Sequence, residues 1–178
     1  HLMATVLASY PETTQKIPFH IRDVTEHEWG AAARAASHGG SYGSMCMHAL
    51  ERDLGVPQDY IIPTMSCTSA MEATLLSLRK LGILKKNDKV LVPAYSFAAN
   101  DNVLARNELE PIYVGCSVPS MHMNVSDAKV AIQQHPDVAA IVILDYAGAP
   151  APRDLFDIAR EHNLLILVDA AQGVGTVC

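Results

Sequence analysis

A carboxylate that could serve a ligand stands at the end of a strongly apolar stretch. Leu164 to Val168 form an unbroken apolar run that leads into Asp169, and Ala170, Ala171 and Gln172 follow. A run without alternation is typical of a strand that is buried on both faces of a parallel sheet. Ligands of such sheets bind beyond the carboxyl ends of the strands. Asp169 could therefore bind a flat ligand, for which the small residues beside it leave room, or it could cap a backbone amide in an ordinary turn. The residues alone leave both interpretations open.

Hydroxyl side chains gather at a second point, where a strand would give way to a helix. Tyr60 to Met65 are expected to form a short strand, which Ser66, Thr68 and Ser69 follow. Apolar residues at helical spacing then begin at Met71. The free amides and the positive dipole end of a helix start favour an anion, and phosphate is a natural occupant. Capping by a single Ser or Thr is the alternative, although three hydroxyls exceed what one cap requires.

An aromatic residue follows a third expected strand. Val90 to Pro93 should form this strand, and Phe97 lies between it and an expected helix from Ala98 to Asn107. Phe97 could stack on a planar ligand, or it could belong to the core. If the three strand ends meet at one edge, they join a phosphate site, a flat side chain and a carboxylate. That combination fits pyridoxal phosphate, whose ring is an electron sink when a carboxylate keeps its nitrogen protonated.

The remaining elements alternate so that a layered fold can position these groups. A capping pair, Thr25 and Glu28, should open a first helix that ends near Ser37, and a second should run from Ser44 to Leu54. Further strands are expected at Pro111–Gly115 and Val138–Asp145, and further helices from a Ser126 cap to Gln134 and from Pro152 to His162. Strands and helices alternating at this spacing predict an α/β fold of three layers, α/β/α, with a largely parallel sheet.

Composition narrows the class of protein. The chain has 178 residues, of which 49% are hydrophobic and 18% charged, and this favours a globular domain with a real core. A formal net charge of -6 argues against nucleic acid or an anionic membrane as the partner. No apolar run approaches the ~20 residues of a membrane span. Four cysteines without close pairing favour a reduced, cytoplasmic setting, and no His or Cys spacing indicates a metal site.

Five short motifs occur in an order and spacing that resemble the DegT/StrS sugar aminotransferases, a branch of the fold-type I pyridoxal phosphate enzymes. The resemblance covers the chain from about Val24 to Gly175. The motifs are Ser66-Cys67-Thr68-Ser69-Ala70, Val92-Pro93-Ala94-Tyr95-Ser96-Phe97, Pro111-Ile112-Tyr113-Val114, Tyr146-Ala147-Gly148 and Val168-Asp169-Ala170-Ala171-Gln172. Each is modest alone, but five in register are fairly specific.

The resemblance implies a role for each matching residue. Thr68 and Ser69 would hold the cofactor phosphate, Phe97 would stack on the ring, Asp169 would pair with the pyridine nitrogen, and Gln172 would lie near the ring hydroxyl. It also implies the large domain of a fold-type I enzyme, a homodimer, and amino transfer to a keto group of a nucleotide-linked sugar, commonly from glutamate. In this interpretation residues 1–3 resemble a cloning remnant, residues 4–24 form an N-terminal arm, and residues 25–178 form part of the large domain.

The chain departs from the family pattern in three ways. Gly115 stands where the family usually has Asp, and Asp145 stands where it often has His, so that Asp145 and Tyr146 are expected near the substrate. The family's Schiff-base lysine lies downstream of the Asp-x-x-Gln motif, as does a smaller C-terminal domain, and this chain is expected to lack both. The lysines present are Lys16, Lys80, Lys85, Lys86, Lys89 and Lys129, and none is assigned that role.

Three interpretations of function follow. The first is the N-terminal part of a sugar aminotransferase, cut by cloning design, proteolysis or a gene break, and inactive alone. The second is a non-catalytic subunit that binds pyridoxal phosphate or phosphate, or a partner, with the same fold. The third is an unrelated α/β nucleotide-binding protein, which ranks low because the sequence has no Gly-rich phosphate loop of the Rossmann or Walker type.

Overall fold

The computed structural model describes residues 26–37 and 42–173, and the chain divides into two compact units, residues 1–46 and 47–178. The first unit contains α2 (Glu26–Ser37) and the beginning of α3 (Tyr42–Leu54), which continues into the second unit. The two helices expected before residue 55 are therefore confirmed, although α3 begins two residues earlier than Ser44. The expected cap at Thr25, the arm over residues 4–24 and the remnant over residues 1–3 lie outside the described residues.

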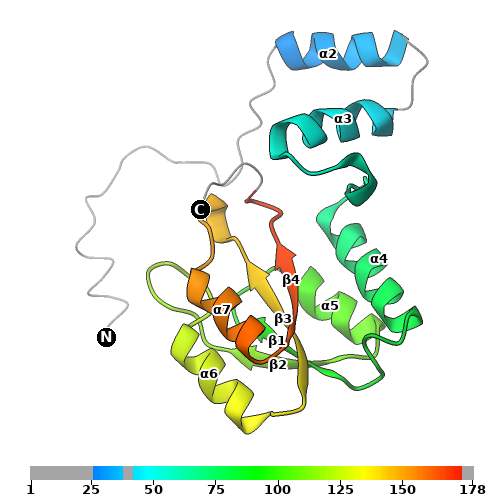
Figure 1. Ribbon diagram of the computed structural model, residues 1–178. Helices are drawn as coiled ribbons and strands as arrows, with labels where there is room; N and C mark the ends of the chain where they lie inside the picture. Colours follow the sequence, from blue (N-terminus) through cyan, green and yellow to red (C-terminus); the bar gives the residue numbers. More distant parts are fainter. Residues whose placement is uncertain (1–25, 38–41, 174–178) are drawn as a thin grey trace, which may run out of the picture. The chain divides into compact units, whose positions relative to one another are not determined.

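The second unit is built on a sheet of parallel strands (Figure 1). The strands are β1 (Lys89–Pro93), β2 (Glu110–Val114), β3 (Val138–Leu144) and β4 (Leu165–Asp169), in the order β2-β1-β3-β4. In the register, Pro93 lies opposite Val114, and Leu144 lies opposite Asp169. The four strands expected from Val90 onward are confirmed, with bounds that differ by one residue or so.

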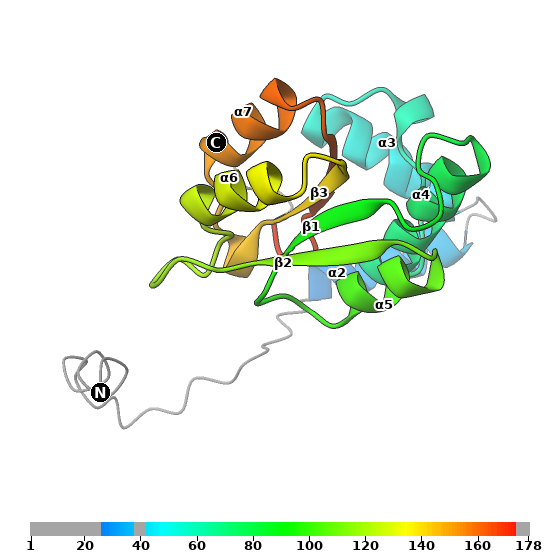
Figure 2. The ribbon, with the colours of Figure 1, turned by 90° about the horizontal axis from the view of Figure 1, so that it is seen from below.

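Helices cover both faces of this sheet, so that the fold has the three layers expected (Figure 2). On one face, α4 (Cys67–Lys80) and α5 (Ala99–Arg106) pack against side chains that include Val92 and Val142. On the other face, α6 (Val125–Gln134) and α7 (Arg153–Glu161) pack against Leu91 and Ile143. Successive side chains of a strand point to opposite faces, which is why each strand contributes to both halves of the core.

The segment before α4 is not the strand that the sequence predicted. The structure has a short 3-10 helix at Gln58–Tyr60, and irregular backbone leads from there to Ser66. Tyr60, Ile62 and Met65 are 80%, 81% and 99% exposed, and no pairing strand accompanies them in the described chain. The apolar, β-branched composition was misleading because a strand also needs a neighbour for its backbone hydrogen bonds.

Two further expectations need correction. The cap of α6 is Asn124, whose side chain accepts a hydrogen bond from the amide of Asp127 at 3.0 Å, so Ser126 lies inside the helix. In β4 the side chains are not buried on both faces, because Val168 is 43% exposed. Within the part of the chain that the structure describes, β4 pairs only with β3 and forms an edge of the sheet.

Candidate functional site

The loops that carry the predicted site residues leave the same edge of the sheet, which we call the carboxyl edge. Because the strands are parallel, the loops after β1, β2, β3 and β4 all emerge there (Figure 1). Phe97 follows β1, Asp145 and Tyr146 follow β3, and Gln172 follows β4. The start of α4 reaches the same edge, since Cys67 contacts Asp169.

Asp169 is the centre of this edge, and it is a buried carboxylate that is 6% exposed. Strand alternation turns its side chain to the face that Leu165 and Leu167 share with α4 and α5. Oδ2 accepts a hydrogen bond from Nδ2 of Asn100 at 3.0 Å. Oδ1 accepts one from the thiol of Cys67 at 3.3 Å and one from the amide of Ala171 at 3.1 Å. Asp169 thus caps a backbone amide, as the turn interpretation expects, and it also binds two side chains from distant elements.

The thiol of Cys67 stays protonated beside this carboxylate. Burial is the largest cause that raises the pKa of Cys67 from its ordinary 9.0 to about 11, followed by the hydrogen bond to Asp169 and the negative charge of that residue. Each effect disfavours the thiolate. At neutral pH Cys67 is therefore a hydrogen-bond donor and not a nucleophile.

The turn over residues 66–69 combines ordinary capping by Ser66 with exposed residues at the start of α4. Ser66 is the N-cap of α4, and its Oγ accepts a hydrogen bond from the amide of Ser69 at 3.1 Å. The hydroxyls of Ser66 and Ser69 are 3.0 Å apart. Thr68 and Ser69 are both exposed. Single-residue capping therefore accounts for Ser66, while a role of Thr68 and Ser69 toward a phosphate stays a prediction.

Aromatic residues line the loops after β1 and β3. Phe97 is 73% exposed, so its ring is available to a planar ligand. The rings of Tyr95 and Tyr146 meet edge to face with centroids 5.5 Å apart, and their hydroxyl oxygens are 3.4 Å apart. The hydrogen bond with Tyr95 is the first cause that raises the pKa of Tyr146 above its usual value.

Gln172 and Asp145 tie the loops after β3 and β4 together. Oε1 of Gln172 accepts a hydrogen bond from the amide of Ala147 at 2.8 Å. Oδ1 of Asp145 accepts one from the amide of Ala151 at 2.9 Å, and the backbone amide of Asp145 donates to the carbonyl of Asp169 at 3.1 Å. Asp145 also lies close to Gly173: a Cβ atom added to Gly173 would be 2.7 Å from the Cβ of Asp145. These contacts hold the predicted cofactor and substrate residues in adjoining loops.

Asn100 is the site residue that the sequence analysis missed, and the role of Cys67 toward Asp169 was missed with it. Asn100 is 1% exposed and lies in the first turn of α5. It falls on the same helical face as the buried Val103 and Leu104. A polar residue at an apolar position of a helix needs a buried partner, and this signal could have directed attention to Asn100.

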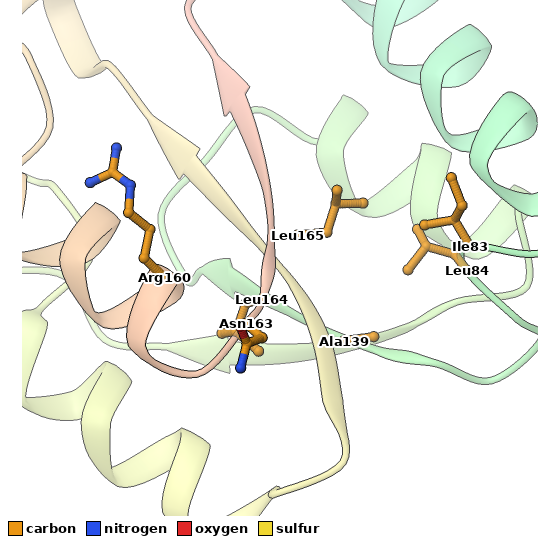
Figure 3. A pocket seen from close by; sticks show the side chains of 7 residues that line it. All are labelled: Ile83, Leu84, Ala139, Arg160, Asn163, Leu164 and Leu165. Atoms are coloured by element: carbon orange, nitrogen blue, oxygen red, sulfur yellow. The ribbon is translucent and has the colours of Figure 1, made fainter.

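A hollow of about 510 Å³ lies at the opposite edge of the sheet, away from these residues (Figure 3). Its lining includes Ala139 and Leu165 at the beginnings of β3 and β4, together with Ile83 and Arg160. Figure 3 shows the labelled side chains on both sides of β4. Arg160 is the one titratable residue among those that line the hollow, and the lining contains no carboxylate, hydroxyl, thiol or aromatic ring.

Over residues 26–37 and 42–173, His, Cys, Asp and Glu side chains form no group of three that could hold a metal ion. In the same ranges, no helix has the length and apolar character needed to cross a membrane.

Comparison with known proteins identifies the family. The sequence pattern of the DegT/DnrJ/EryC1/StrS aminotransferase family matches residues 37–178. A protein of Methanocaldococcus jannaschii, MJ1066, is 31% identical over 117 residues, which are 65% of this chain and 29% of that protein. The structure of NtdA from Bacillus subtilis with its bound cofactor PMP has a TM-score of 0.76 at 26% identity, over 92% of this chain and 38% of that one.

A third comparison concerns the fold alone. A GDP-4-keto-6-deoxymannose-3-dehydratase with a trapped PLP-glutamate geminal diamine has a TM-score of 0.76 at 18% identity, over 88% of this chain and 42% of that one. The chain spans less than half the length of each of these proteins. The sheet order, the helices on both faces and the matched pattern confirm the fold and the family that the sequence motifs indicated. The chain belongs to the DegT/DnrJ/EryC1/StrS aminotransferase family.

Proposed function

We propose that this chain is the cofactor-binding part of a pyridoxal phosphate-dependent aminotransferase. The observation that carries the proposal is the buried carboxylate of Asp169 at the end of β4, beside the N-terminus of α4, where Thr68 and Ser69 are exposed. The cofactor-bound NtdA and the dehydratase support pyridoxal phosphate as the cofactor. When bound, pyridoxal phosphate supplies a ring that accepts electrons from the reacting carbon.

The residues at the carboxyl edge fit such a cofactor. Thr68 and Ser69 are exposed at a helix start, where amides and hydroxyls suit a phosphate. The exposed ring of Phe97 can stack on the pyridine ring. Asp169 would accept a hydrogen bond from the protonated ring nitrogen, because the described residues place only hydrogen-bond donors, and no cation, beside its carboxylate. Gln172 would lie near the ring hydroxyl.

The substrate proposed is a nucleotide-linked sugar with a keto group, and the amino donor is an amino acid such as glutamate. The resemblance of the sequence motifs to sugar aminotransferases and the likeness to the GDP-4-keto-6-deoxymannose-3-dehydratase support a sugar-directed reaction. Asp145 and Tyr146 would lie near the sugar, since their loop adjoins that of Gln172. We further propose a homodimer, which the family resemblance favours, and a cytoplasmic setting, which the free thiols of Cys67 and Cys116 in the described part of the chain favour.

The positions of the lysines favour cofactor binding without catalysis by this chain. Lys86 pairs with Glu108, and Lys89 pairs with Asp137, both at the edge of the sheet opposite to Asp169. Lys80 ends α4, Lys85 follows it, and Lys129 lies in α6, while Lys16 is outside the described residues. Amino transfer requires an amine that moves a proton between substrate and cofactor, and neither a carboxylate nor an amide replaces it. A non-catalytic binding subunit of the same fold is the alternative.

Binding is tested with pyridoxamine phosphate, which has no aldehyde and so cannot label surface lysines. The unmodified chain should show one saturable site by calorimetry. Thr68→Val and Asp169→Asn should each weaken binding about tenfold, because each removes a contact to a charged group. Ser126→Ala, an exposed change in α6, should leave binding unchanged. Equal affinity in all four proteins would overturn the assignment of the site.

Catalysis is tested separately by treating the chain with pyridoxal phosphate and borohydride and mapping the modified lysines by mass spectrometry. We expect scattered partial modification and no amino transfer from glutamate. Stoichiometric modification of a single lysine, together with amino transfer, would show that one of the six is catalytic and that the chain is active by itself.

A further inference from the structure

We propose that Asn100 and Cys67 are positioning residues for the cofactor, which fix the carboxylate of Asp169 and leave one acceptor position on its Oδ2 for the pyridine N–H. The inference rests on the proposed function, because it assigns the means by which Asp169 is held for the role proposed above. Neither residue belongs to the set that the sequence motifs selected as binding the cofactor.

The count of hydrogen bonds at Asp169 carries the inference. A carboxylate oxygen accepts about two hydrogen bonds. Oδ1 already accepts two, from the thiol of Cys67 at 3.3 Å and the amide of Ala171 at 3.1 Å. Oδ2 accepts one, from Asn100 at 3.0 Å. Oδ1 therefore has its full number of hydrogen bonds, and the remaining acceptor position of the carboxylate is on Oδ2.

The position of the two donors in the fold makes them suited to alignment. Cys67 is the first residue of α4 and adjoins Thr68, which we propose as a phosphate-binding residue. Asn100 lies in the first turn of α5, and its backbone amide donates to the carbonyl of Phe97 at 3.0 Å. Asp169 is thus bonded to both segments that would hold the phosphate and the ring. These hydrogen bonds fix the carboxylate relative to the other two parts of the cofactor site.

Both donors keep their hydrogens under ordinary conditions. The amide of Asn100 does not titrate, and its side chain is enclosed, with 1% of the residue exposed. The raised pKa of Cys67 keeps its thiol protonated at neutral pH. Both are uncharged, so they orient the carboxylate without forming an ion pair that would compete with a protonated ring nitrogen.

The test compares pyridoxamine phosphate with its 1-deaza analogue, which has a carbon in place of the ring nitrogen. The affinity ratio of the two ligands reports the contact of Asp169 with that nitrogen and cancels changes in phosphate binding or general stability. The unmodified chain should prefer pyridoxamine phosphate about tenfold or more, and Asp169→Asn should abolish the preference. If the unmodified chain shows no preference, the proposed role of Asp169 fails, and the present inference fails with it.

The positioning residues are then tested by the same ratio. Asn100→Leu and Cys67→Ala should lower the preference several-fold while the affinity for the 1-deaza analogue stays constant. Cys67→Ser, which retains a donor, should keep most of the preference, and Asn102→Leu, an exposed change in the same helix, should keep all of it. Should Asn100→Leu fail to fold, Cys67→Ala decides.

Two results would overturn the inference and leave the proposed function standing. In the first, Asp169→Asn abolishes the preference, but Asn100→Leu and Cys67→Ala retain it. In the second, these two variants weaken the binding of both ligands equally, which would mean that the residues support the fold and not the contact with the ring nitrogen.

Discussion

The chemistry of single residues at the carboxyl edge depends on which neighbours of Asp169 carry protons. Asn100, Cys67 and the amide of Ala171 all donate to it. A buried carboxylate without a cation is stable only when donors surround it. The same contacts that make Asp169 tolerable inside the protein also determine where it can receive a ligand.

The thiol of Cys67 should react with alkylating reagents far more slowly than an ordinary cysteine. Its pKa is raised to about 11, so less of it is thiolate at pH 8, and we expect labelling about tenfold or more slower than in the urea-unfolded chain. Because folding raises the pKa of Cys67, the protonated thiol contributes to the free energy of unfolding. This contribution is fully present below pH 9 and is lost as the pH rises toward 11.

This prediction is measured by alkylation at several pH values, with the peptide containing Cys67 quantified by mass spectrometry. Asp169→Asn should accelerate the labelling, because it removes the negative charge that opposes the thiolate. A folded chain whose Cys67 titrates at or below pH 9 would contradict the hydrogen bond between the thiol and Asp169.

At the scale of elements, the structure places the cap of α6 at Asn124, whereas the sequence predicted Ser126. Asn124→Ala should cost about 1 kcal/mol of unfolding free energy, because it removes the acceptor for the amide of Asp127. Ser126→Ala should change stability by only a few tenths of a kcal/mol, since the exposed Ser126 lies inside the helix. Urea unfolding of the two variants measures the difference, and a larger loss for Ser126→Ala would show that the cap is misplaced.

Sequence periodicity predicted most elements because their apolar faces are regular. The strands were indicated by short apolar runs such as Val90 to Pro93, and α4 by the apolar residues at helical spacing that begin at Met71. The pairing of strands cannot be inferred from local composition. The segment from Tyr60 to Met65 has the composition of a strand but has no partner strand in the described residues.

The candidate site shows the same division between local and long-range information. Asp169 stood out because a carboxylate follows an apolar run, whereas the contact of Asn100 with it joins residues 69 positions apart. Motifs therefore indicated the residues expected to touch the cofactor. The residues that hold Asp169 in place became evident only from the packing of α4 and α5 against β4.

At the scale of the whole molecule, the edge of the sheet at β4 should promote self-association. The strand pairs only with β3 among the described residues, and Val168 is 43% exposed. Exposed strand edges tend to pair with other chains. Light scattering should show an apparent mass that rises with concentration, and Val168→Lys should suppress the rise. Val130→Lys, a comparably exposed position on α6, should not, and a monomer at all concentrations would contradict this prediction.

The central claim is that the cofactor binds at the carboxyl edge and not in the hollow at the other end of the sheet. Titration of the isotopically labelled chain with pyridoxamine phosphate, followed by amide NMR, tests it most directly. We predict saturable shifts at Thr68, Ser69, Asn100, Ala147 and Gln172, and constant signals for Ile83, Asn163 and Leu165. Saturable shifts confined to the residues of the hollow, or the absence of any saturable shift, would contradict the account.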